Sequence, residues 1–244
     1  PGTTFGKSKE GKSSITNFDD KENIPVREII VALFRLSMFR QLLLFSFVTT
    51  LLRSIFIFWT PKFLVDIGMG DSSAIFKSAL FPFLGCLGTV LLGWYTDKYA
   101  SDGNRARAMW IMLVGLVVCL AGITALVKFG SEHHNLIVFL VSMSGFFLLG
   151  PYSMSSGALT LDIAGSKGAG SCTGIIDGIG YLGGALAAWG AGVLSDRLGW
   201  TEVFGLLTVC SVLAVVSAYM MSHSYVKARL REQKVAAREV PDDH

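Results

Sequence analysis

Charged residues are scarce in this chain. Only 16% of its 244 positions hold Asp, Glu, Lys or Arg, whereas a soluble globular domain carries about 25%. Hydrophobic residues fill 52% of the positions, and the mean hydropathy is +0.55. A chain with so little charge is too apolar for water, so the composition indicates a membrane protein.

Several site motifs are also missing. The sequence has no Gly-rich phosphate loop ending in Lys-Ser and no set of nucleophile, base and orienting residue, so we predict that it is not an enzyme. His133 and His134 are adjacent on a loop and would not converge as metal ligands do. Four cysteines lie in apolar runs without metal-ligand spacing and are interpreted as small packing residues: Cys86, Cys119, Cys172 and Cys210. We expect no metal, no cofactor and no nucleic-acid partner.

Six apolar stretches are each long enough to cross about 30 Å of hydrocarbon as a helix of about 20 residues. They lie at 41–60, 74–95, 108–128, 135–158, 168–194 and 202–222. Short polar segments between them, including 162–167, predict loops. The sequence therefore predicts an all-α, polytopic membrane protein in which residues 28–224 form one six-helix domain.

Both ends of the chain are polar. Residues 1–27 are rich in Lys, Ser, Gly and Asp and lack the apolar core of a signal peptide, so we expect a flexible segment. The chain begins at Pro1 rather than Met, which suggests a piece of a longer or processed protein. The basic tail at 225–244 either extends the last helix along anionic lipid headgroups or is solvated.

The distribution of Lys and Arg predicts which segments share a side of the membrane. The segment through Arg40 holds seven, the 97–107 loop three, the 162–167 loop one and the tail five. The opposite side holds four, at Lys62, Lys77, Lys128 and Arg197. The positive-inside rule therefore places both termini in the cytoplasm or its topological equivalent.

Arg53 lies deep inside an otherwise apolar span, about a dozen residues from Gln41. A guanidinium near mid-bilayer costs at least roughly 2.5–3.5 kcal/mol, so such a charge usually faces a water-filled cavity or a partner. Its planar fork matches the oxygens of phosphate or carboxylate. The sequence predicts an anion site at Arg53, with a structural salt bridge or a snorkelling side chain as the alternative.

A short pattern, Gly-x-x-x-Asp-basic, occurs twice. Its first copy, Gly93 to Lys98, ends the second span, and its second copy, Gly192 to Arg197, ends the fifth. Three crossings separate the copies, so they emerge on opposite membrane faces. That arrangement is typical of two three-helix units related as an inverted repeat.

The stretch from Gly93 to Arg107 resembles the loop motif of the major facilitator superfamily. Other stretches resemble its organophosphate:phosphate antiporters, which include glycerol-3-phosphate transporters and eukaryotic sugar-phosphate exchangers; they lie at Leu51–Pro61, Gly150-Pro151 with 157–167, and Gly174–Gly184. The resemblance covers about residues 28–230. It implies the carboxy-terminal half of a twelve-helix transporter, built as a 3+3 inverted repeat, with residues 1–27 in the central cytoplasmic loop.

The resemblance also implies roles for single residues. In that family one Arg from each half clamps the phosphoryl group, and Arg53 falls at the matching position, while Tyr181 falls at a cavity-lining aromatic position. Asp97, Lys98 and Arg105 match the loop motif, where a carboxylate at a helix end can latch a neighbouring helix in one conformation. The alternative for this motif is a solvated turn that only sets topology.

The chain departs from the glycerol-3-phosphate antiporters at three places. Phe58 and the apolar residues around Pro82 stand where those antiporters have acidic residues, so ion-pair gating is not expected there. Asp177 lies mid-span, where the bacterial antiporter has no acid, in a string more similar to the eukaryotic exchangers. Asp177 is a candidate substrate-binding residue that would bind sugar hydroxyls. The alternatives are an ion pair with a basic residue of the missing half, or a protonated side chain that only packs against neighbouring helices.

Small and polar residues fill two of the spans. Tyr152, Ser153, Ser155 and Ser156 follow Pro151 as a polar stripe beside an expected kink, where freed carbonyls need partners, and each is a candidate for lining the site. Six glycines in the fifth span predict close helix packing, with a moving gate as the alternative: Gly170, Gly174, Gly178, Gly180, Gly183 and Gly184.

The residues and the resemblance together predict a membrane transporter that exchanges an organic phosphate, such as a sugar phosphate or glycerol 3-phosphate, for inorganic phosphate by alternating access. Another organic-anion carrier of the same superfamily is one alternative, because Arg also suits carboxylate. A transporter-like sensor or a structural subunit of a membrane complex is the other. The expected partners are the two phosphate substrates, the lipid bilayer and the missing amino-terminal six-helix half.

Overall fold

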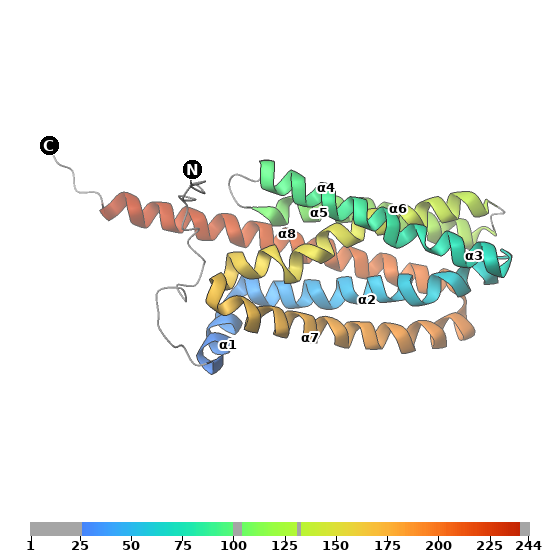
Figure 1. Ribbon diagram of the computed structural model, residues 1–244, viewed down its shortest axis with the longest axis horizontal. Helices are drawn as coiled ribbons and strands as arrows, with labels where there is room; N and C mark the ends of the chain where they lie inside the picture. The colour runs from blue at the N-terminus through green and yellow to red at the C-terminus, as the bar shows by residue number, and fades with distance from the viewer. Residues whose placement is uncertain (1–25, 100–103, 131–132, 240–244) are drawn as a thin grey trace, which may run out of the picture.

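The computed structural model describes residues 26–99, 104–130 and 133–239; the flexible segment predicted for the amino terminus lies almost wholly outside these ranges. Every regular element described is an α-helix (Figure 1), which confirms the all-α prediction. The helices are α1 (Val26–Arg35), α2 (Ser37–Asp66), α3 (Asp71–Ser78), α4 (Leu80–Tyr99), α5 (Arg105–Lys128), α6 (His134–Ser156), α7 (Ala158–Leu198) and α8 (Trp200–Glu239).

Six segments are long and apolar enough to cross a membrane, which confirms the six predicted spans. Most of them extend several residues beyond the predicted ends, and the second combines α3 and α4 with a break at Ala79. They run Ser37–Asp66, Asp71–Tyr99, Arg105–Lys128, His134–Ala164, Gly168–Leu198 and Trp200–Lys227.

The loop predicted at 162–167 is helical instead. α7 continues through this segment, although the fourth span ends at Ala164 and the fifth begins at Gly168. The chain folds back here (Figure 1), so that the Thr173 hydroxyl donates a hydrogen bond of 3.1 Å to the carbonyl oxygen of Ser156. The polar composition marked the boundary between spans correctly, but composition does not distinguish a loop from a polar helical turn.

The helices pack mainly as three pairs. α2 lies along α7, α4 along α6, and α5 along α8. In span order the first pairs with the fifth, the second with the fourth, and the third with the sixth. If the first span is exchanged with the fourth, the second with the fifth and the third with the sixth, the same three pairs result. This is the symmetry expected of the predicted 3+3 repeat.

Close approach in two of these pairs depends on glycine. A Cβ at Gly88 would lie 2.1 Å from the carbonyl oxygen of Phe146, and one at Gly183 would lie 2.4 Å from that of Phe47. The six glycines of the fifth span divide evenly: Gly180, Gly183 and Gly184 face α2, whereas a Cβ at Gly170, Gly174 or Gly178 would meet nothing within 4 Å. The packing interpretation therefore holds for three of them.

The cysteines divide in a similar way. Cys119 and Cys172 are buried among the helices and Cys210 is half-buried, whereas Cys86 faces outward. The prediction that all four are packing residues is wrong for Cys86, because a small apolar residue in a span is equally suited to a lipid-facing position.

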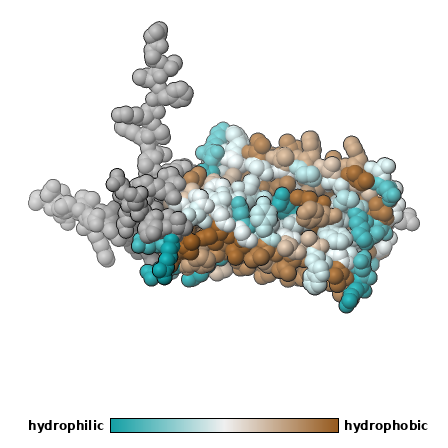
Figure 2. All heavy atoms as spheres, turned by 60° about the horizontal axis from the view of Figure 1, so that its bottom comes forward, coloured by the Kyte–Doolittle hydropathy of each residue, from teal (hydrophilic) through white to brown (hydrophobic). Residues whose placement is uncertain are grey.

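On the face that Figure 2 shows, hydrophobic residues form bands along the bundle with a paler band between them, and hydrophilic residues gather toward the two ends. Large residues such as Val90 and Trp189 are 68% and 72% exposed, which fits a surface covered by lipid rather than water. We define the proximal end by α1, Asp97 and Arg105, and the distal end by Asp66 and Asp196. The described chain begins and ends at the proximal end (Figure 1).

Candidate functional site

Arg53 lies near the middle of α2, sixteen residues after Ser37, which is about 24 Å along the helix. Its side chain is half-buried. Within the described part of the chain, no carboxylate lies within ion-pair distance of its guanidinium. The structural salt bridge that the sequence left open is therefore not formed among these residues.

The side chain that faces Arg53 is Tyr152, one residue after Pro151 in α6. The guanidinium carbon Cζ of Arg53 lies 4.9 Å from the centroid of the Tyr152 ring, within the range of a cation–π interaction. Tyr152 is thus the member of the predicted polar stripe that reaches Arg53. The ring attracts the guanidinium without neutralising its charge.

Two serines of the stripe contact the backbone instead. The Ser153 hydroxyl donates to the Gly150 carbonyl at 2.8 Å, and the Ser155 hydroxyl donates to the Tyr152 carbonyl at 2.7 Å. Pro151 has no N–H, so the carbonyl oxygen of Phe147, four residues earlier, loses its helical donor. The two hydroxyls instead bond carbonyl oxygens three residues before their own, and neither reaches that of Phe147.

Asp177 and Tyr181 lie four residues apart on α7 and therefore on one face of it. Asp177 is half-buried and Tyr181 is 66% exposed. Ser54, the neighbour of Arg53, faces Gly184, which is seven residues and about 10 Å beyond Asp177. The structure places Asp177 and Arg53 at different levels of the α2–α7 pair and does not bring them together.

Arg105 joins three helices at the proximal end. Its Nη1 lies 2.8 Å from Asp97 Oδ1, its Nε lies 3.5 Å from Asp162 Oδ2, and Nη1 also donates to the Thr96 hydroxyl at 3.3 Å. The Arg105 and Asp162 side chains are only 15% and 21% exposed, whereas Asp97 is 69% exposed. The cluster connects the end of α4, the start of α5 and α7.

One predicted gating residue lies outside this cluster, and one member was missed. The Nζ of Lys98 lies 5.0 Å from the centroid of the Trp94 ring and 5.4 Å from that of Tyr99. In the sequence, Asp162 marks only the edge of a predicted polar loop. The available signal was an acidic residue at the end of the fourth span, on the side that holds the basic motif.

The second copy of the repeated motif forms a different cluster at the distal end. Lys62 Nζ lies 2.7 Å from Asp66 Oδ2 and 3.4 Å from Asp196 Oδ1, and Trp200 Nε1 donates to Asp66 at 2.9 Å. These contacts join the ends of α2 and α7 to the start of α8. The charged groups are exposed, so each ion pair contributes little to stability.

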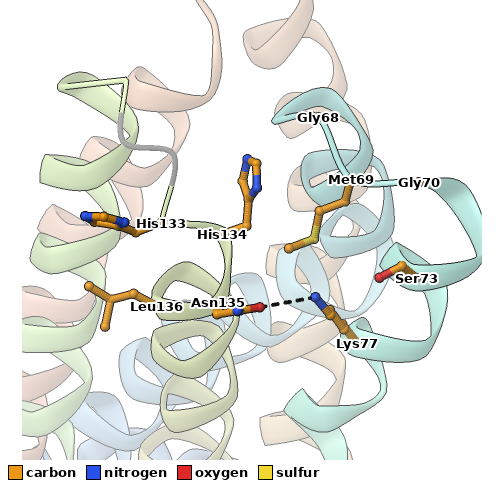
Figure 3. Close-up of a pocket in the computed structure, with 9 residues that line it drawn as sticks. All are labelled: Gly68, Met69, Gly70, Ser73, Lys77, His133, His134, Asn135 and Leu136. Carbon is orange, nitrogen blue, oxygen red and sulfur yellow. Dashed lines mark hydrogen bonds between the residues drawn. The ribbon is translucent and has the colours of Figure 1, made fainter.

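A surface pocket of about 510 Å³ opens at the distal end, and Arg53 is not among the residues that line it. Figure 3 shows these lining residues. Lys77 donates to the Asn135 side chain at 3.4 Å across the pocket, and His134 Nε2 lies 2.9 Å from the Ile67 carbonyl. The rings of His133 and His134 point away from each other (Figure 3). Among the described residues, no group of three His, Cys, Asp or Glu side chains is placed to hold a metal ion.

Comparison with known proteins gives matches over most of the chain. A family model described as Major Facilitator Superfamily matches residues 5–188 and 42–241. Sugar phosphate exchanger 3 of Mus musculus is 28% identical over 172 residues, which cover 66% of this chain and 33% of that protein.

Two further relatives give similar values. The glycerol-3-phosphate transporter of Bacillus subtilis is 29% identical over 162 residues, covering 65% of this chain and 35% of the relative. A glucose-6-phosphate exchanger of Xenopus laevis is 28% identical over 217 residues, which cover 83% of this chain and 42% of that protein. The chain spans less than half of the length of these relatives.

Proposed function

Since the chain belongs to the major facilitator superfamily, we propose that it is part of a membrane transporter that exchanges an organic phosphate for inorganic phosphate. Arg53 carries this proposal, because it is a half-buried guanidinium at mid-span with a ring rather than a carboxylate beside it. Its fork can bind two oxygens of a phosphoryl group. The names of the relatives, which refer to sugar phosphate, glycerol 3-phosphate and glucose 6-phosphate, support an organic phosphate as the substrate.

Charge balance accounts for obligatory exchange. The empty site leaves Arg53 positive inside the hydrocarbon region, which is unfavourable. A phosphate dianion bound between Arg53 and a second cation offsets this charge and lets the loaded protein change between its two open states. The empty protein resists that change, so it can return only with another phosphate bound, and each crossing is coupled to one in the opposite direction.

The second cation is proposed to come from an amino-terminal six-helix half. A large partner is favoured by the relatives, which are more than twice as long as the aligned stretch. The face of α7 that carries Asp177 and Tyr181 also holds Gly174 and Gly178. A Cβ added at either glycine would have no described atom within 4 Å, so this face is uncovered. With the other half against this face, Asp177 and Tyr181 would line the space between the halves.

Exchange in proteoliposomes tests this proposal. In the full-length transporter, reconstituted with internal inorganic phosphate, we expect Arg53→Ala to abolish uptake of glucose 6-phosphate and glycerol 3-phosphate. Expression and thermal stability should change little, because the substitution removes a costly charge rather than an apolar contact. The control is Arg197→Ala, which removes an exposed Arg at the distal end and should leave exchange at the wild-type rate.

Two outcomes would redirect the assignment. A well-folded Arg53→Ala protein with wild-type exchange would contradict the phosphate clamp. A wild-type protein that exchanges carboxylates but not phosphates would instead support the organic-anion alternative, because a carboxylate also fits the guanidinium fork.

A further inference from the structure

The helix α1 lies across the proximal end of the bundle rather than along it (Figure 1). Leu36 separates α1 from α2 with an extended backbone, at φ −75° and ψ 123°. Leu33 is fully buried and α1 packs against α7 as well as α2, so its position is fixed by contacts with the spans. Because the spans cross the bilayer, α1 has the orientation of a helix that lies in the plane of the membrane interface.

The outer face of α1 combines arginines with exposed apolar residues. Arg27, Val31 and Arg35 follow at spacings of four and therefore form one stripe, about 12 Å long. Val31 is 46% exposed and Phe34, beside the stripe, is 44% exposed. A surface hollow of about 590 Å³ is lined by Arg27, Glu28, Val31, Ala32 and Arg35.

Charge on and around this face is mainly positive. Arg27, Arg35 and Arg40 are exposed, and Glu28 is the acidic residue of α1. Arg40 also donates to the backbone carbonyl oxygen of Phe34 at 3.5 Å, which places a third guanidinium at the last turn of α1. Basic groups next to apolar anchors are the pattern of helices that bind anionic membrane surfaces.

We propose that α1 is an interfacial anchor that binds the phosphate of an anionic lipid headgroup between Arg27 and Arg35, with Val31 and Phe34 inserted below it among the acyl chains. The long arginine side chains can extend toward the headgroups while their aliphatic stems stay in the apolar layer. The basic tail is less suited to this role, because α8 continues to Glu239 along its own axis and projects beyond the proximal end (Figure 1).

Lipid binding by the purified full-length protein tests this site without any transport measurement. Native mass spectrometry would count bound phosphatidylglycerol in competition with phosphatidylcholine. We expect wild type to retain phosphatidylglycerol selectively and the double variant Arg27→Gln/Arg35→Gln to bind it about thirtyfold more weakly, as expected for the loss of two interfacial charges. The matched control is Lys128→Gln/Arg197→Gln, which removes two exposed charges at the distal end and should bind like wild type.

A second measurement keeps α1 almost intact. A Val31→Cys protein whose native cysteines are replaced by Ser, labelled with an environment-sensitive dye, should show blue-shifted emission in vesicles that contain phosphatidylglycerol but not in pure phosphatidylcholine. Equal lipid binding by the two double variants, or an unshifted dye, would overturn the proposal. Displacement of phosphatidylglycerol by millimolar inorganic phosphate would also overturn it, because the hollow would then be a site for free anions.

Discussion

A guanidinium beside an aromatic ring keeps its full charge and its hydrogen-bond donors. The face of Tyr152 attracts Arg53 across 4.9 Å, with an energy of about 0.5–2 kcal/mol that depends on how far the pair is desolvated. A carboxylate in the same place would occupy the N–H groups of the fork. Tyr152 can therefore hold Arg53 in position while leaving it able to bind an anion.

Substitution of Tyr152 should separate the ring from the hydroxyl. In the complete transporter we expect Tyr152→Ala to weaken phosphate binding by about two- to thirtyfold, which is the loss of one cation–π contact. Tyr152→Phe keeps the ring face and should stay within about twofold of wild type. Isothermal titration with inorganic phosphate measures both values, and equal losses would assign the effect to the hydroxyl.

At the scale of helices, the cluster around Arg105 ties the end of α4 and the start of α5 to α7. Asp97 and Asp162 both contact Arg105, but they come from α4 and α7. The cluster lies at the proximal end of the bundle, whereas Arg53 lies near the middle of its span. We therefore infer that it biases conformation and does not contribute to substrate affinity.

Single substitutions of the two carboxylates test that inference. Asp97→Asn and Asp162→Asn should each shift the ratio of the two open states, measured by cysteine accessibility from either side, and keep phosphate affinity within about twofold. Lys128→Gln is the matched control, because it removes an exposed charge at the distal end and should leave the ratio unchanged. Loss of phosphate binding with an unaltered ratio would be inconsistent with a latch.

Helix pairing makes a separate prediction about stability. Gly88→Ala places a Cβ against the backbone carbonyl of Phe146 and should destabilise the protein by about 1–3 kcal/mol, as overpacking does. Gly205→Ala in α8 is the matched control, because no described atom lies within 4 Å of its Cβ position. Thermal unfolding in detergent should show a lower Tm for Gly88→Ala alone, and equal values would contradict the close approach of α4 and α6.

At the scale of the whole molecule, topology and charge make one joint prediction. The spans return the chain to the proximal end, and basic residues are concentrated there in the sequence, so both tails should be cytoplasmic. Impermeant maleimide labelling of single cysteines placed in each tail, in sealed vesicles of known orientation, measures this. Labelling of only one tail from a given side would show that the number of crossings is wrong.

Much of the architecture was predictable from the sequence. Apolar runs of membrane-spanning length identified six spans. The two copies of the motif, ending at Lys98 and Arg197, indicated two related three-helix units, and the pairing of the helices agrees with this. The family resemblance carried by the motif from Gly93 to Arg107 is confirmed by the family match. These features depend on local composition and spacing, which the sequence displays directly.

The contacts of the site were less predictable, because they depend on how distant helices pack. Arg53 was identified from its depth in a span, but its partner Tyr152 is on α6, and nothing in the spacing indicated which residue of the stripe would face it. The contact of Asp162 with Arg105 was not predictable, because the polar residues around Asp162 are compatible with either a loop or a helix. Lys98 shares the motif with Asp97 and Arg105, yet it packs on neighbouring rings.

The central claim is that Arg53 binds a phosphoryl group through its planar fork, and binding of inorganic phosphate to Arg53→Lys tests it most directly. A bidentate bond between guanidinium and phosphate contributes about 1.5–3 kcal/mol net. Isothermal titration of the folded full-length protein should therefore show affinity about tenfold to a hundredfold weaker in Arg53→Lys than in wild type, although the charge is retained. An Arg53→Lys protein that binds phosphate as tightly as wild type would contradict the claim.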